Sequence, residues 1–109
     1  MAVSLKEYSP WIQLDLSIAH CIHSVKIYDQ AFNYESDDDM ANVRVTIGKS
    51  ESDVTEEGDK YLCAYNEGQP PGDEFTMTCF EILYGRFVRV TLIGISNHLR
   101  LREMEIFGW

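Results

Sequence analysis

Apolar and polar residues alternate with a period of two in several short stretches of this chain. The clearest stretch lies at residues 43–47, where Val43, Val45 and Ile47 share one face. Successive side chains of a strand point to opposite faces, so each stretch predicts a strand with one buried face. Thr46 lies on the opposite, outward face. The other stretches lie at residues 11–16, where Leu14 faces inward and Trp11 outward, at 86–92, where Arg89 faces outward, and at 23–28 and 75–79. Polar and turn-forming segments separate them, which is typical of an all-β sandwich or barrel.

The last alternating stretch changes phase partway along. Leu99 and Leu101 occupy odd positions, whereas Met104 and Ile106 occupy even ones. One extra residue moves every later side chain to the opposite face of a strand. The change therefore predicts a β-bulge, or a strand that passes from one sheet to the other, at residues 102–103. A simple corner of a sandwich is the plainer interpretation.

The acidic composition narrows the classes of partner. The chain has 109 residues, of which 18 are acidic and 9 basic, a net charge of −9. Nucleic acids and anionic membranes are not expected as partners, because their phosphates would be repelled and no basic stripe is visible. Cations, neutral sugars and basic protein surfaces stay open. The length fits one domain, residues 1–109, and no apolar run approaches the ~20 residues of a membrane helix. The opening residues show no signal peptide.

The three cysteines give no metal pattern. Cys21, Cys63 and Cys79 form no CxxC motif and have no histidine pair nearby. An odd number of cysteines allows one disulfide and one free thiol. The count alone does not fix the compartment in which the chain resides.

An ordered set of motifs resembles one family. The motifs are PWIQLDL, IHSVKIY, MANVRVTIGKS, YLCAY, FTMTC followed by YGRFVRVTL, and LRLREMEIFG at the end. Together they resemble the F-type lectins, or fucolectins, within the discoidin-like, galactose-binding-like superfamily. The resemblance runs from about Ser9 to Trp109 and lacks the family's N-terminal part.

The resemblance implies a fold, a disulfide and a location. The fold would be a jelly-roll-like β-sandwich of the galactose-binding-domain type, shortened at its N-terminus. Its exposed sheet edge would need cover from residues 1–8 or from a partner. The family's disulfide falls on Cys63 and Cys79, the alternative being two reduced, buried thiols; Cys21 would be a core thiol. The family is largely secreted, so an extracellular location is expected.

The family's fucose site does not carry over. F-type lectins hold fucose with one histidine, two arginines and a pair of adjacent cysteines. The histidine precedes the region of resemblance, and the arginine-bearing loop falls on residues 29–39, DQAFNYESDDD, which contain no Arg, Lys or Cys. Carboxylates only accept hydrogen bonds where arginine only donates them, so the family's fucose recognition is not expected.

That same loop still supplies the candidate sugar-binding residues. Aromatic faces suit both sugars and protein interfaces, and carboxylates can accept hydrogen bonds from sugar hydroxyls. The candidates are Phe32, Asn33, Tyr34, Asp37, Asp38 and Asp39. The plainer interpretation is that the rings cover one end of the sandwich and the aspartates form a solvated acidic loop.

The family's calcium site also looks incomplete. Glu103 matches its acidic ligand, but Arg102 stands where the family has a cysteine. One carboxylate cannot supply the six to eight oxygens that calcium takes, so no cofactor is expected.

The sequence therefore predicts a non-catalytic, lectin-like module that binds a glycan or glycoprotein through degenerate fucose and calcium sites. The alternative is a protein-interaction or structural domain without a glycan ligand. No nucleophile with a recognisable base appears. Glu103 and Glu105 share a strand face, but nothing else favours catalysis.

Overall fold

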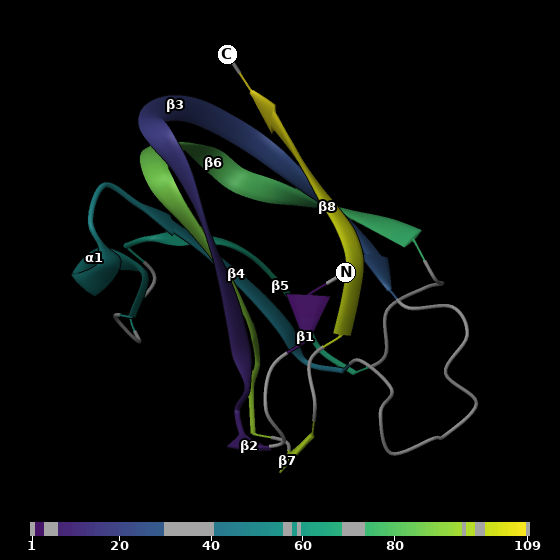
Figure 1. Ribbon diagram of the computed structural model, residues 1–109. Helices are drawn as coiled ribbons and strands as arrows, with labels where there is room; N and C mark the ends of the chain where they lie inside the picture. The colour runs from purple at the N-terminus through teal and green to yellow at the C-terminus, as the bar shows by residue number, and fades with distance from the viewer. Residues whose placement is uncertain are drawn as a thin grey trace.

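The computed structural model describes residues 2–3, 7–29, 41–55, 58, 60–68, 74–94, 96–97 and 100–108 (Figure 1). Strands dominate this part of the chain, and the only helix in it is one short turn. The elements are β1 (Ala2–Val3), β2 (Glu7–Tyr8), β3 (Trp11–Asp29), β4 (Val43–Gly48), α1 (Glu51–Thr55), β5 (Leu62–Asn66), β6 (Glu74–Leu92), β7 (Ser96–Asn97) and β8 (Arg100–Gly108). No helix among the described residues has the length and apolar character needed to span a membrane.

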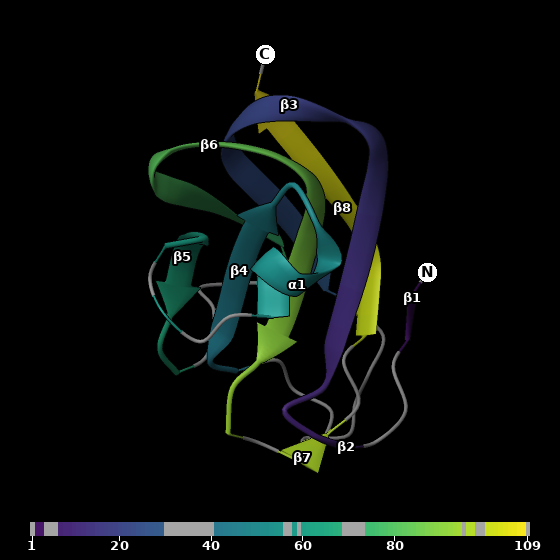
Figure 2. The same cartoon turned by 90° about the vertical axis from the view of Figure 1, so that its left-hand side faces the viewer.

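Two long, bent strands organise the fold. The six-stranded sheet has the antiparallel order β1-β8-β3-β6-β4-β5, and β2 pairs with β7. β3 and β6 pair along both of their halves, from Trp11 opposite Thr91 to Tyr28 opposite Glu74. Both strands curve over in the middle, so the sheet folds back on itself as two layers (Figures 1 and 2). This confirms the predicted β-sandwich. Residues 11–16 and 23–28, expected as separate strands, are the two halves of β3.

The core comes from the inward face of each alternating stretch. Val43, Val45 and Ile47 of β4 are buried as expected. So are the apolar residues of the other strands, namely Val25, Ile27, Phe75, Met77, Val88, Val90 and Leu92. Alternation in the sequence therefore identified the core correctly, because each strand here has one face toward the other layer.

Some side chains depart from the alternation, and Leu14 and Thr46 are two examples. Leu14, expected to face inward, is 37% exposed because it lies close to the bend of β3. Thr46, expected to face outward, is buried under α1, and its hydroxyl donates a hydrogen bond to the Val54 carbonyl at 2.9 Å. Periodicity gave no signal for α1, since a five-residue helix is too short to show one.

The phase change in the last strand is a β-bulge. Tyr28 of β3 lies opposite Glu103 of β8, and the next β3 residue, Asp29, lies opposite Leu101. Arg102 is the extra residue between these two pairs, at the predicted place. Beyond the bulge, Ala2 and Val3 of β1 pair with Leu101 and Arg100. Ala2 and Val3, from the N-terminal segment expected to cover a sheet edge, thus add a strand beside β8.

The cysteines behave in two ways. Cys63 of β5 and Cys79 in the first half of β6 form a disulfide, as the resemblance implied. Because β5 belongs to one layer and this half of β6 to the other, the disulfide ties the two layers together. Cys21 lies within β3 as a free thiol and is only partly buried, so the expectation of a core thiol was wrong.

Candidate functional site

The loop singled out by the sequence joins β3 to β4. Its candidate residues, Phe32, Asn33, Tyr34, Asp37, Asp38 and Asp39, lie outside the described residues. The structure therefore describes the strands that carry the loop, β3 and β4, and the side chains at its base.

A polar cluster lies on the outer face of the sheet just before this loop. The Tyr28 hydroxyl donates a hydrogen bond to the Glu105 carboxylate at 2.5 Å, and the Lys26 ammonium lies 5.0 Å from the centre of the Tyr28 ring. The bond to Glu105 raises the pKa of Tyr28, because it stabilises the protonated phenol. The loop thus begins one residue beyond a hydrogen-bonded tyrosine that is tied to the neighbouring strand.

Glu103, the matched calcium ligand, lies next to this cluster. It is exposed and stands opposite Tyr28 in the pairing of β3 with β8. The described residues hold no group of three His, Cys, Asp or Glu side chains arranged to bind a metal ion. Glu105, its neighbour on the same face, is engaged by the Tyr28 hydroxyl.

A second candidate site lies on the outer face of the other layer. Between the start of β3 and α1 there is an open groove of about 560 Å³, with β4 and β6 as its floor. Figure 2 shows α1 in front of β4 and β6, with β3 on its right. The described residues that line this Trp11 groove include Trp11, Arg44, Thr46, Val54, Arg89 and Thr91.

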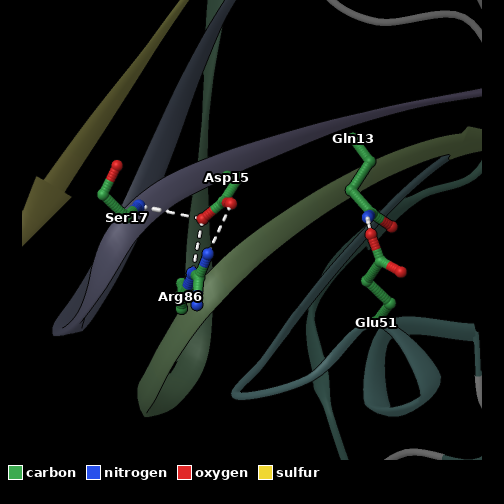
Figure 3. A network of polar contacts seen from close by, with 5 residues as sticks. All are labelled: Gln13, Asp15, Ser17, Glu51 and Arg86. Carbon is green, nitrogen blue, oxygen red and sulfur yellow. Dashed lines mark hydrogen bonds and ion pairs between the residues drawn. The ribbon is translucent and has the colours of Figure 1, made fainter.

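The Trp11 ring and the Arg89 guanidinium form the centre of the groove. The guanidinium carbon lies 3.7 Å from the centre of the ring, a cation–π contact, and Arg89 Nε donates a hydrogen bond to Gln13 Oε1 at 3.0 Å. Partial burial lowers the pKa of Arg89, and the charge of Glu51 opposes that effect. Gln13 in turn reaches Glu51 on α1 through its amide nitrogen, at 3.4 Å (Figure 3).

Sequence reasoning missed the Trp11 groove. Alternation placed Trp11 and Arg89 on outward faces, but it could not place them beside one another. Their contact depends on the pairing of β3 with β6, which sets Trp11 opposite Thr91 and Gln13 opposite Arg89. The sequence showed only that one stretch has a tryptophan on its outward face and that another has an arginine there, and this is too little to predict a groove.

Comparisons with solved structures identify the fold. A fucolectin from striped bass (Morone saxatilis) serum matches 98% of this chain, with a TM-score of 0.77 and 25% identity. The lectin domain of lectinolysin, solved with Lewis b antigen, matches 98% with a TM-score of 0.75 and 21% identity. A family 32 carbohydrate-binding module from Clostridium perfringens, solved with galactose, matches 92% with a TM-score of 0.67 and 13% identity.

The extent of these matches differs between the neighbours. This chain spans 34% of the bass fucolectin, 70% of the lectinolysin domain and 67% of the bacterial module. No protein-family model and no curated protein sequence matches the chain. The match in structure covers nearly the whole chain for the bass fucolectin and the lectinolysin domain. The chain thus has the β-sandwich fold of the F-type lectins and the related discoidin-like, galactose-binding-like modules.

Proposed function

We propose that this chain is a non-catalytic, lectin-like module that binds a glycan through residues 29–39. The observation that carries the proposal is the sandwich it shares, over 98% of its length, with a fucolectin and a Lewis b-binding lectin domain. Loops that are carried by a rigid scaffold vary freely and are the usual place for binding residues. The loop joining β3 to β4 is such a segment, and it offers two aromatic rings and carboxylates that accept hydrogen bonds from sugar hydroxyls.

The fucose and calcium sites of the F-type lectins are degenerate in this proposal. The segment contains no arginine or lysine to donate hydrogen bonds to fucose, and the Glu103 carboxylate falls short of a calcium shell. We therefore expect a glycan ligand, and we do not expect fucose alone to be enough for its recognition. Binding is expected to be independent of calcium.

The test is a glycan array, run with and without a chelator, on the chain and on two variants. The double variant Phe32→Ala plus Tyr34→Ala should lose binding of neutral glycans. Tyr65→Ala removes a ring that is 41% exposed on β5, and this matched control should keep binding. Free fucose should not raise the melting temperature. A blank array, or binding of neutral glycans that survives the double variant, overturns the proposal.

A specific observation favours the alternative of a protein-interaction domain. Three large side chains near the bend of β6 are well exposed, namely Phe80 at 76%, Ile82 at 51% and Tyr84 at 55%. Exposed apolar clusters of this kind often mark protein interfaces. A blank array, together with concentration-dependent association that Phe80→Ser abolishes, would favour this function.

An extracellular location forms part of the proposal. The disulfide between Cys63 and Cys79 supports it, because disulfides persist mainly in oxidising compartments. Non-reducing mass spectrometry of the protein from its natural source tests this. A reduced pair there would contradict an extracellular location.

A further inference from the structure

The Trp11 groove is open, and its floor and walls are of mixed character. Its volume, about 560 Å³, lies in the range of small-molecule sites, roughly 300–1,000 Å³. Trp11, which is 43% exposed, lines the groove at the start of β3, and Val54 and Thr55 line it from α1. Strands β4 and β6 form the floor, and Ser9, Ile93 and Gly94, which lie just outside the strands, also line the groove.

The indole gives the groove a flat apolar surface with a polar edge. Arg89 stacks on the ring and fixes its orientation, at 3.7 Å from guanidinium carbon to ring centre. Thr91 and Ser9, which carry hydroxyl groups, also line the groove. An apolar ring beside hydroxyl and guanidinium groups suits a sugar, whose C–H face is apolar and whose edge carries hydroxyls.

The charge in the groove is opposite to that of the chain. Arg44 and Arg89 both line it, in a chain with a net charge of −9. The Arg89 guanidinium is partly removed from water, yet among the described residues its one hydrogen-bond partner is the neutral Gln13 amide. The charge of Glu51 acts on it, and this carboxylate accepts a hydrogen bond from Gln13.

A partly desolvated guanidinium without a hydrogen-bonded carboxylate favours an anionic partner. The guanidinium presents several N–H donors in a planar fork, which matches the geometry of a carboxylate. Polyanions such as nucleic acids fit poorly, because the remaining acidic surface repels a chain of phosphates. A sugar ring with a single carboxylate offers an anion to the Arg89 guanidinium and does not carry the chain of phosphates that the acidic surface would repel.

We infer that the Trp11 groove is a saccharide-binding site for carboxylate-bearing sugars, with the ring against Trp11 and the carboxylate on the Arg89 guanidinium. This site is built on the sheet face and is separate from the proposal for residues 29–39. It uses side chains of β3, β4 and β6 that lie within the motifs of the family resemblance, but to which the resemblance assigns no ligand. Arg44, whose Nη2 donates to the Gly58 carbonyl at 2.7 Å, adds a second positive charge at the groove.

The probe is methyl β-D-glucuronide, with methyl β-D-glucoside as its neutral match and sodium acetate as the bare anion. Titrations into ¹⁵N-labelled protein follow the indole N–H of Trp11 and the Nε–H of Arg89 by NMR. The glucuronide should give saturable shifts at both groups, and the glucoside and acetate should bind at least about tenfold more weakly. Equal shifts with the glucoside, equal shifts with acetate, or no shifts with the glucuronide would each overturn the inference.

Two variants of Arg89 test the site, and Arg86→Gln and the loop variant serve as controls. Arg89→Gln should weaken glucuronide binding about tenfold or more, and Arg89→Lys should restore only part of it, since lysine keeps the charge but loses the fork. Arg86→Gln removes the same charge from β6 outside the groove and should bind as the unchanged chain does. The Phe32→Ala plus Tyr34→Ala variant should also keep these shifts, which separates this site from the proposed loop site. Loss of the shifts in Arg86→Gln or in the loop variant would refute the assignment.

Discussion

The carboxylate of Asp15 on β3 binds Arg86 on β6 at two points. Arg86 Nε lies 2.6 Å from Asp15 Oδ1, and Nη2 lies 2.8 Å from Oδ2 (Figure 3). The same Oδ1 accepts the backbone N–H of Ser17 at 2.9 Å. Ser17 has a φ of 74°, an uncommon conformation for a residue with a side chain, and it lies where β3 leaves its first layer. The carboxylate therefore links the bend of β3 to the neighbouring bend of β6.

This link should make stability depend on pH in the acid range. The bonds from Arg86 and from the Ser17 backbone lower the pKa of Asp15 from 3.8 to about 2. Because the folded-state pKa is depressed, the ion pair contributes its full stability above the unfolded pKa of 3.8, and the contribution is lost as the pH falls toward 2. Asp15→Asn should thus lower Tm by a few degrees at neutral pH, a small effect since both side chains are exposed.

Calorimetry of Asp15→Asn against the unchanged chain, at about pH 7 and about pH 2.5, measures this difference. The Tm gap should shrink at the lower pH, and Arg86→Gln should show the same trend. A gap that is equal at both pH values would show that the asparagine disturbs the bend for a reason other than charge.

The disulfide should supply a large share of the stability. It closes a loop with a sequence separation of 16, and loops of this length contribute about 3 kcal/mol by restricting the unfolded chain. The double variant Cys63→Ala plus Cys79→Ala should lose about that much free energy of unfolding in urea titrations. Cys21→Ser is the matched control, since Cys21 is a free thiol, and its midpoint should stay near that of the unchanged chain. Equal losses in both variants would contradict a role for the bridge.

How far the sequence predicted the fold is clearest on β4 and β8. Val43, Val45 and Ile47 alternate within six residues, so their inward face could be read locally, and the Arg102 bulge left its mark as a phase change. The bend of β3 left no such mark. β3 continues through Ser17, which has a left-handed conformation. The alternation before Ser17 does not continue in the same pattern after it, so the sequence predicts two separate strands.

The candidate sites were harder to predict than the core. The groove between Trp11 and α1 combines residues of β3, β4 and β6 that are up to eighty positions apart, and a short helix that alternation does not detect. Only the pairing register brings Gln13 opposite Arg89. The loop at residues 29–39 could be named from the resemblance, but its candidate residues lie outside the described part of the chain.

Gly85 should be intolerant of a side chain. A Cβ built there would lie 2.7 Å from the Ile47 side chain and 2.8 Å from the Gly48 carbonyl oxygen, which is backbone and cannot turn aside. Gly85→Ala should therefore destabilise the sandwich by about 1–3 kcal/mol, the usual range for overpacking. Gly58→Ala is the control, because a Cβ there meets no described atom within 4 Å. Urea unfolding of both variants measures the difference in stability. An unchanged midpoint for Gly85→Ala would show that β4 and β6 can move apart to make room for the side chain.

Asn42, which directly precedes β4, should contribute to the stability of the layer that contains β4 and β6. Its side chain donates to the Ile93 carbonyl at 3.2 Å and accepts the Gly68 N–H at 2.8 Å, while its backbone bonds the same two residues at 2.9 and 3.0 Å. Its φ of 52° is a conformation that asparagine and glycine adopt most readily.

Two substitutions separate the conformation of Asn42 from its hydrogen bonds. Asn42→Gly keeps the backbone conformation but loses both side-chain bonds, so it should cost about 1–2 kcal/mol. Asn42→Ala loses the bonds and also strains the backbone, so it should cost about 1 kcal/mol more than the glycine variant. Urea unfolding of the two variants measures the difference. If alanine is tolerated as well as glycine, the left-handed conformation is not what selects asparagine; if glycine is as stable as asparagine, the two side-chain bonds contribute nothing.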